Sequence, residues 1–438
     1  MTSLPTSESD LAPHAPLVAR TVALSPADGT SLLALLPATS PRDTTSWVRR
    51  GDGLVGWGRT LSVTAHGAGR FAALESWWSE VSGSAVVRDE VDLPGTGPVA
   101  FGAISYAADS PSGATLVVPS VVVGRRGDRW WVTTTSTDAL PPNVDPSVST
   151  DAVAPGDVTF ADGSLSPAEW AGAVAEAVTR IQAGALDKVV LARDLDVRTA
   201  APIDVRWLLG RLAESYGSTW VFAVDGLVGA TPEMLVRREK GLVTSRVLAG
   251  TIRRTGDDEH DLALAASLAR SSKDLEEHEY AVRSVAEALA PHCSSMNVPE
   301  APFVLHLSNV MHLATDVAGV LTDRTTSLAL AASLHPSAAV CGTPTSVADG
   351  LISELEHMDR GRYAGPVGWI DASGDGEWGI ALRSGAIHHE DDHRMSLYAG
   401  CGIVAGSVPE AEVAESDAKL IPMRDALTAT TPRPERTP

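Results

Sequence analysis

Two pairs of acidic residues have the spacing of a metal site. Asp274 and Glu277 lie three residues apart in a segment with a helical pattern, and Glu412 and Glu415 are spaced in the same way in another. Residues at i and i+3 share a helix face, so each pair can direct two carboxylates the same way. Two such faces that met would form an all-oxygen pocket suited to Mg²⁺. The alternative for each pair is an ordinary solvated helix surface in an acidic protein.

A lysine and a glutamate could supply acid–base chemistry. Lys188 begins a β-like segment, in which its side chain shares a face with Val190 while Arg193 points the other way. Either its stem packs with the ammonium in water, or the partly desolvated amine acts as a general base. Glu233 follows a proline and is flanked by apolar residues. A carboxylate in such a setting can stay protonated and act as a general acid, and the alternative is an exposed position at a strand edge.

Arg383 has the surroundings of a carboxylate-binding residue. It lies in a strand-like run, 376–387, in which Gly379 and Ala381 share its face. These small neighbours leave room for a ligand beneath the guanidinium, which can hold a carboxylate through two hydrogen bonds. The alternative is a surface arginine on a thinly packed sheet.

Glycines and a second lysine offer further contacts to an anion. Gly250 and Gly400 lie inside strand-like runs. Glycine is unfavourable there unless a ligand approaches the backbone closely or a bulge forms. Lys419 lies four residues after Glu415, so it is either an ordinary ion-pair partner or a carboxylate ligand beside the metal.

Periodicity and turn residues predict the elements that position these side chains. Helices are expected at 167–185, 204–215 with Asp204 as N-cap, 257–290 as one or two helices, 346–358 and 410–427. Single strands are expected at 115–123, 129–135, 188–197, 365–371, 376–387 and 395–405, and several strands joined by tight turns at 219–252. Consecutive strands joined by short turns pair in antiparallel fashion. The predicted class is therefore α+β, with antiparallel β-sheets packed with surrounding helices.

A proline-rich connector at 137–167 divides the chain. The division predicts an N-terminal β-rich part (1–160), packed into the same globule, a catalytic domain (166–427) and a flexible tail (428–438). The alternative is that the connector is a long loop within one domain.

Composition excludes several classes of protein. The 438 residues include 34 Lys and Arg against 55 Asp and Glu, a net charge of −21, which argues against binding to nucleic acid or an anionic membrane surface. Cys293, Cys341 and Cys401 are too few and scattered for a disulfide framework or a zinc site, which favours a reducing compartment, the cytoplasm. We find no signal-peptide pattern and no apolar run of the roughly 20 residues that span a bilayer.

Short segments that contain these residues occur in a distinctive order between about residues 166 and 427. They are KVVLAR (188–193), GATPEML (229–235), LAGT (248–251), KDLEEH (273–278), LHP (334–336), AVCGTP (339–344), YAGPVGW (363–369), GEWGIALR (376–383), AGCGIVA (399–405) and EAEVAESDAK (410–419). Together they resemble the chorismate-utilising enzyme family. The resemblance implies that 166–427 is a chorismate-binding domain with the fold of the anthranilate synthase component I family.

The resemblance also implies roles for single residues. Lys188 is the expected base for water and Glu233 the expected acid. Glu277 and Glu415 are the expected Mg²⁺ ligands, with Asp274 and Glu412 beside the ion. The positions expected to contact substrate are Gly250, Thr251, His335, Ala339, Tyr363, Arg383, Gly400 and Lys419.

Two of these positions bear on the reaction. Family members that use ammonia lack the base lysine, and salicylate-forming members favour threonine at the position of Ala339. Lys188 and Ala339 therefore favour the branch that adds water at ring carbon 2 of chorismate and expels the carbon-4 hydroxyl, giving isochorismate for menaquinone or siderophore biosynthesis. The alternatives are a salicylate synthase, which goes on to eliminate pyruvate, and a non-catalytic binding relative. Chorismate and Mg²⁺ are the expected ligands, and a monomer or homodimer the expected assembly.

Overall fold

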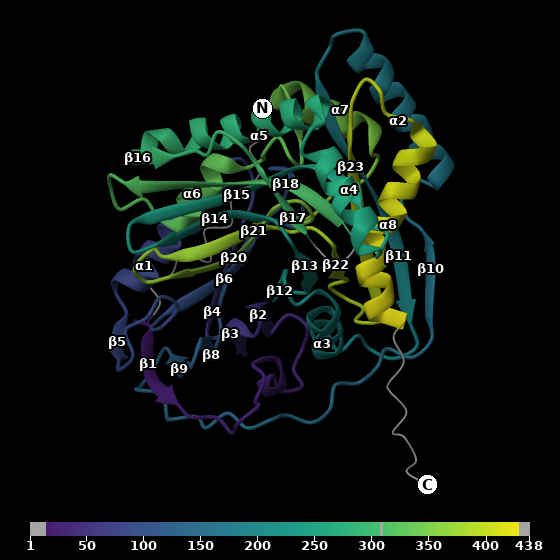
Figure 1. Ribbon diagram of the computed structural model, residues 1–438. Coiled ribbons are helices and arrows are strands. Elements are labelled where there is room, and N and C mark those ends of the chain that lie inside the picture. The colour runs from purple at the N-terminus through teal and green to yellow at the C-terminus, as the bar shows by residue number, and fades with distance from the viewer. Residues whose placement is uncertain (1–14, 307–309, 429–438) are drawn as a thin grey trace, which may run out of the picture.

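Two large β-sheets packed face to face form the centre of the molecule (Figure 1). The computed structural model describes residues 15–306 and 310–428, without the side chains of Thr251, Lys273 and Glu277. Within these residues the first sheet has 13 strands and the second has 10.

The first sheet runs from a C-terminal edge to an N-terminal edge. Its order is β10 (Val158–Asp162), β11 (Lys188–Thr199), β23 (Arg394–Ile403), β22 (Ser384–Ile387), β13 (Leu227–Thr231), β12 (Trp220–Val224), β2 (Thr44–Arg49), β3 (Asp52–Trp57), β8 (Val121–Arg126), β9 (Arg129–Ser136), β1 (Val18–Leu24) and β5 (Val86–Asp89), with β19 (Gly342–Thr343) beside β11.

The second sheet also joins distant segments. Its order is β16 (Cys293–Asn297), β18 (Val310–Leu321), β15 (Leu242–Arg253), β14 (Met234–Glu239), β21 (Gly376–Ile380), β20 (Pro366–Asp371), β6 (Val99–Ala103), β7 (Ala114–Val118) and β4 (Leu61–Ala65), with β17 (Phe303–His306) beside β18.

Aromatic side chains from both sheets fill the space between them. Trp47 and Phe222 project from the first sheet, and Phe101 and Trp369 from the second, into one buried cluster. Each is at most 4% exposed, so their burial supplies a large share of the apolar area that joins the sheets.

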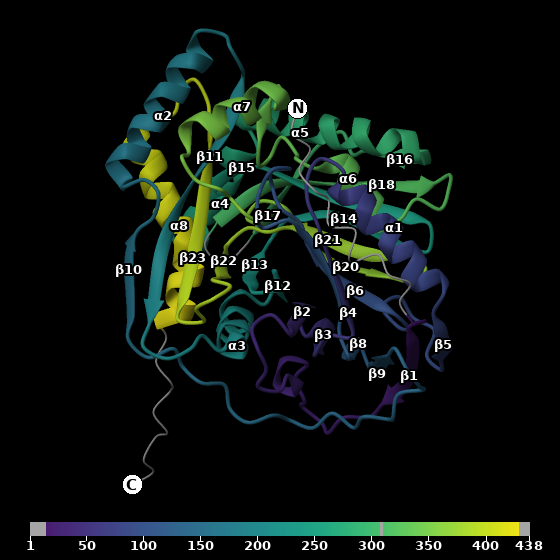
Figure 2. The same cartoon turned by 180° about the vertical axis from the view of Figure 1, so that it is seen from behind.

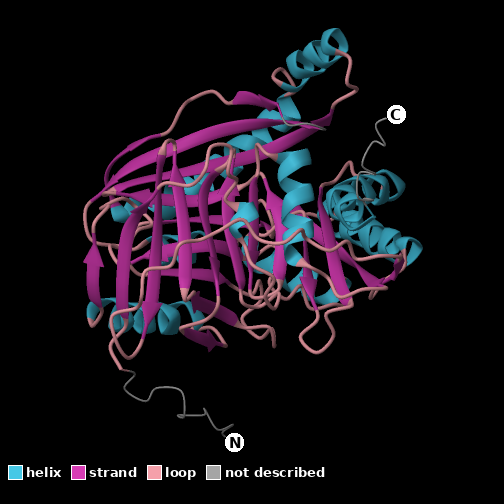
Figure 3. Ribbon diagram, turned by 90° about the horizontal axis from the view of Figure 1, so that it is seen from below, coloured by secondary structure: helices cyan, strands magenta, loops and turns pink. Residues whose placement is uncertain are grey.

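Helices cover the outer faces of both sheets, as Figures 1 and 2 show. Those on the second sheet are α1 (Arg70–Gly83), α4 (Asp258–Leu268), α5 (Ser272–Leu289) and α6 (Ser327–Leu334); those on the first are α2 (Pro167–Gln182), α3 (Val205–Tyr216), α7 (Thr345–Leu355) and α8 (Pro409–Thr428). The antiparallel sheets and surrounding helices confirm the predicted α+β class (Figure 3).

Local sequence signals placed most helices correctly. The Asp204 side chain caps α3 by accepting a hydrogen bond from the Arg206 backbone N–H. The predicted stretch 257–290 is two helices, α4 and α5, each with its own N-cap at Asp257 and Ser271. The connector 137–167 contributes only the edge strand β10 to the described sheets, as its prolines require.

Two strand predictions are wrong. The segments 115–123 and 376–387 are each two strands, and the two halves belong to different sheets. In the second segment the chain leaves β21 after Ile380 and enters β22 at Ser384, with Arg383 at φ +49°. Arg383 therefore does not lie on one continuous strand face with Gly379 and Ala381.

The chain crosses between the sheets at two adjacent places. It passes from β13 to β14 through Glu233, and from β21 to β22 through Arg383. The crossings are hydrogen-bonded to each other: the Ile380 N–H donates to the Glu233 carbonyl (3.1 Å), and the Ala230 N–H to the Arg383 carbonyl (3.2 Å). A candidate acid and a candidate anion-binding residue thus come together where the sheets meet.

Both sheets contain strands from either side of residue 160. The division into parts 1–160 and 166–427 stays a prediction, and the predicted tail lies outside the described residues except for Thr428, the last residue of α8. Across the described ranges, no helix combines the length and apolar character needed to span a membrane.

Candidate active site

A cavity of about 250 Å³ opens beside the two chain crossings. It is bounded by β11, β23 and α8 on one side and by β15, β18 and α5 on the other. The predicted site residues that line it are Lys188, Glu233, Gly250, Asp274, Ala339, Tyr363, Arg383, Gly400, Glu412, Glu415 and Lys419. Residues more than 200 positions apart thus surround one space of the size of a small metabolite.

The protonation state of Glu233 indicates the role that this residue can have in the site. Its side chain is buried next to the cavity. Burial raises its pKa to about 7, although the cationic Arg383, Lys188 and Lys419 act in the opposite direction. A carboxyl group with this pKa carries its proton for much of the time near neutral pH, as a general acid must.

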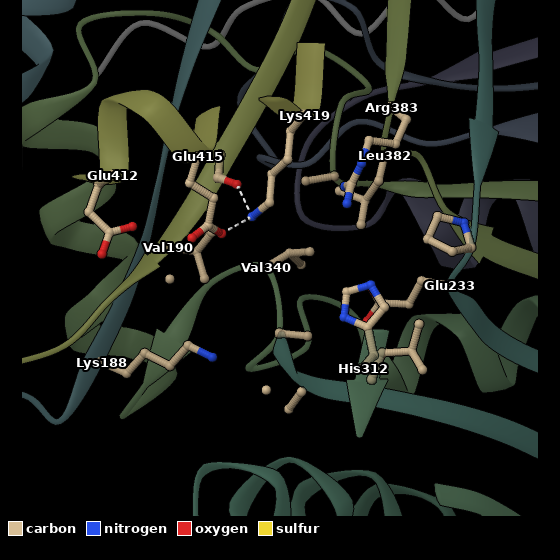
Figure 4. Close-up of a pocket in the computed structure, with 18 of the residues that line it drawn as sticks. Lys188, Val190, Glu233, His312, Val340, Leu382, Arg383, Glu412, Glu415 and Lys419 are labelled. Carbon is tan, nitrogen blue, oxygen red and sulfur yellow. Dashed lines mark hydrogen bonds and ion pairs between the residues drawn. The ribbon is translucent and has the colours of Figure 1, made fainter. Parts of the chain in front are cut away.

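Lys188 enters the cavity from the opposite side (Figure 4). It begins β11 and shares its face with Val190, while Arg193 points to the other face and donates to Ser416 (2.8 Å) and Asp417 (2.5 Å). This confirms the predicted alternation. A Cβ atom on Gly402 would lie 2.9 Å from the Lys188 Cε, so the absence of a side chain at Gly402 gives the lysine stem its path.

Lys419 and Glu415 form an ion pair at the cavity wall (Figure 4). The Lys419 Nζ lies 2.7 Å from the Glu415 Oε1 and donates to the Gly400 carbonyl at 2.8 Å. Burial alone would lower the pKa of Lys419, but the anionic surroundings, Glu415 included, outweigh it and raise the pKa. Burial likewise opposes ionisation of Glu415, whose pKa Lys419 nevertheless lowers. Both groups are therefore charged at neutral pH.

The carboxylates in the cavity fit an oxygen-preferring cation. Asp274 on α5 and Glu412 and Glu415 on α8 all line it, and ligand atoms of Glu412, Glu415 and Cys401 lie within 4.8 Å of one another. Burial raises the pKa of the Cys401 thiol to about 12, so the thiol stays protonated and is a poor ligand. Oxygen donors remain, which is the set that Mg²⁺ prefers. The side chain of the predicted ligand Glu277 lies outside the described part of the structure.

The two predicted site glycines, Gly250 and Gly400, differ in backbone pairing. Gly250 has φ +75° and lies at a bulge between Ala249 and Thr251 in β15, so the bulge alternative is confirmed. It nevertheless faces the cavity, where a Cβ atom would lie 3.2 Å from the Asp274 Cβ. Gly400 instead pairs in regular register with Ala192. The side chain of Thr251 is not among those described.

His335 is not among the described residues that line the cavity. Its imidazole lies between Phe71 and Tyr106, and its Nε2 is 2.9 Å from the Tyr106 carbonyl oxygen. Burial lowers its pKa to about 4, so the ring is neutral. The predicted contact of His335 with the substrate ring stays a prediction.

Two lining residues with ionisable side chains were not predicted from the sequence. His312 enters from β18, and its pKa falls to about 3, because burial disfavours the cation and Arg383 and Lys419 repel it. Its only signal in the sequence is a histidine within an apolar strand. Arg360 lies four residues after Glu356, a spacing that could have indicated the ion pair.

Arg360 fastens two backbone segments of the cavity wall. Its guanidinium is paired with the Glu356 carboxylate (2.5 Å) and donates to the carbonyls of Val190 (2.7 Å) and Val340 (2.9 Å). Glu356 also accepts the Ala192 N–H at 2.7 Å. Both charged side chains are 2% exposed, so loss of either partner would leave a buried charge unpaired.

Comparison with known proteins agrees with this arrangement. A family model described as chorismate binding enzyme matches residues 7–428. The chain belongs to this family. It is 40% identical over 273 residues to the isochorismate synthase DhbC of Bacillus subtilis. The aligned region covers 60% of this chain and 68% of that protein.

Two further relatives extend the match over more of the chain. The salicylate biosynthesis isochorismate synthase of Pseudomonas aeruginosa is 33% identical over 408 residues, covering 85% of this chain and 82% of the relative. The structure of MenF, the menaquinone-specific isochorismate synthase from Escherichia coli, superposes with a TM-score of 0.75 over 95% of this chain and 96% of the other, at 24% identity. At that identity the superposition supports the fold alone.

Proposed function

We propose that the protein is an isochorismate synthase, an isomerase that converts chorismate to isochorismate. The observation that carries the proposal is that Lys188 and Glu233 enter one cavity from opposite sides, with the pKa of Glu233 raised to about 7. A binding protein needs neither a base nor a protonated acid in that arrangement. The relatives named above carry the same activity in their names.

In the proposed reaction the base and the acid act on different ring positions. Lys188 accepts a proton from water, and the water oxygen bonds to ring carbon 2. The ring double bonds shift, the bond from carbon 4 to its hydroxyl breaks, and the hydroxyl leaves as water with the proton of Glu233. The net change is a relocated hydroxyl group, and no oxidant or reductant is required. The two groups need opposite protonation states at one pH, and burial of Glu233 favours its protonated state.

The cationic groups would hold the two carboxylates of chorismate. Arg383 and the backbone N–H groups near Gly250 and Gly400 would bind one, and Lys419 would bind the other. Asp274, Glu412 and Glu415, together with Glu277, would hold Mg²⁺. The ion would neutralise the ring carboxylate and fix its position.

The water-adding reaction is preferred to the salicylate-forming one because Ala339 lines the cavity where salicylate-forming members favour threonine. Product formation tests both. Purified protein incubated with chorismate and Mg²⁺ should yield isochorismate by chromatography, without the fluorescence of salicylate. Accumulation of salicylate would favour the alternative, and no turnover would refute both. Cytoplasmic location and a monomeric or homodimeric state stay predictions.

A further inference from the structure

A second cavity, of about 840 Å³, lies beside the catalytic one. Its size is within the range of small-molecule sites. Cationic, aromatic and apolar side chains line it together, among them Arg42, Arg59, Leu227, Arg362, Ala386 and Tyr398. None of these residues has a role in the proposed reaction.

The two cavities share a wall. On β23, Ser396 and Tyr398 line the second cavity, and Gly400 and Gly402 line the catalytic one, because alternate residues share a strand face. The Tyr398 ring stacks on Tyr363, with centroids 5.2 Å apart and an interplanar angle of 16°. Tyr363 lines the catalytic cavity, so the stacked rings connect the two spaces.

The charges in the second cavity leave one arginine in excess. Asp225 is paired with Arg59 and with Arg362, each at 2.8 Å, and Arg59 also reaches Asp43 at 3.2 Å. Two acids are thus matched by two arginines. The Arg42 guanidinium makes only long hydrogen bonds, 3.5 Å each, to the carbonyls of Asp225 and Ile387, and no described carboxylate forms a salt bridge with it.

We propose that this second cavity binds a small organic anion, a carboxylate carried on an apolar body. Arg42 would pair with the carboxylate, exchanging two long contacts for a charge-assisted pair. Leu227, Ala386 and the Tyr398 ring would contact the apolar body. Arg42 is a cation without a carboxylate partner among the described residues, in a protein whose net charge is −21. This local positive charge favours an anionic ligand.

Calorimetric titration of the full-length protein tests the site without requiring turnover, so it is independent of the proposed function. The probes are benzoate, the neutral isostere benzamide and inorganic phosphate. The test variant is Arg42→Gln. The matched control, Arg88→Gln, removes the same charge from a side chain that is 60% exposed and lies outside the cavity.

Benzoate should bind wild type and Arg88→Gln alike, and at least about tenfold more weakly to Arg42→Gln. Benzamide should not bind. Equal benzoate affinity in all three proteins would overturn the proposal. So would benzamide binding as tight as that of benzoate, or a protein that binds phosphate through Arg42 and does not bind benzoate. If Arg42→Gln folds poorly by circular dichroism, Ala386→Leu replaces it: this change fills the cavity and keeps every charge, and unchanged benzoate binding there would refute the site.

Discussion

Replacement of Glu233 by glutamine should change the pH dependence of stability. The folded-state pKa of Glu233 is about 7, against 4.5 for an unperturbed glutamate. The folded protein therefore binds a proton that the unfolded chain has lost between these values, and this residue makes stability fall as pH rises through that window. Between pH 5 and pH 8, this one group lowers the free energy of unfolding by about 2 to 3 kcal/mol.

Glu233→Gln removes this loss, because glutamine does not titrate. Urea unfolding of wild type and variant at pH 5 and pH 8 gives the measurement. From pH 5 to pH 8 the unfolding free energy of the variant should rise by about 2 to 3 kcal/mol relative to that of wild type, since the contributions of all other groups cancel in the difference. Glu214→Gln, at an exposed side chain, is the control and should show no such gain. If the difference in unfolding free energy between Glu233→Gln and wild type were the same at both pH values, burial would not hold the proton on Glu233.

Four further results are expected. The kcat/KM for chorismate should fall above pH about 7 as Glu233 loses its proton, and a profile flat to pH 9 would exclude it as the acid. Lys188→Ala should bind chorismate with Mg²⁺ in calorimetry but form no isochorismate, and retained turnover would remove the lysine from the mechanism. Glu277→Gln should require more Mg²⁺ for half-maximal activity, so an unchanged Mg²⁺ titration would contradict its assignment as a ligand. Glu356→Gln should lose about 3–5 kcal/mol of unfolding free energy, because Arg360 keeps its charge in a buried position, and a loss below about 1 kcal/mol in urea unfolding would contradict this.

The sequence predicted those features that depend on local patterns. The helix that Asp204 caps and the alternation at Lys188 follow from the spacing of apolar residues and from a capping side chain, and both are found in the structure. The site residues could be singled out by their types, but only the resemblance to a family joined them. No local pattern brings β11, β15 and α8 to one cavity.

The errors arose where tertiary structure overrides a local pattern. Trp378 to Arg383 alternates bulky and small residues as one strand would, yet the chain changes sheets after Ile380. The left-handed conformation of Arg383, which is unusual for a residue other than glycine, carries no signal in the sequence.

The origin of the new hydroxyl group tests the proposed chemistry most directly. Turnover of chorismate in ¹⁸O-labelled water, followed by mass spectrometry, reports whether the oxygen on ring carbon 2 comes from solvent. Addition of water activated by Lys188 predicts isochorismate that carries one ¹⁸O atom per molecule, located on carbon 2. Unlabelled isochorismate would mean that the original hydroxyl migrates within the substrate, and would contradict the roles assigned to Lys188 and Glu233.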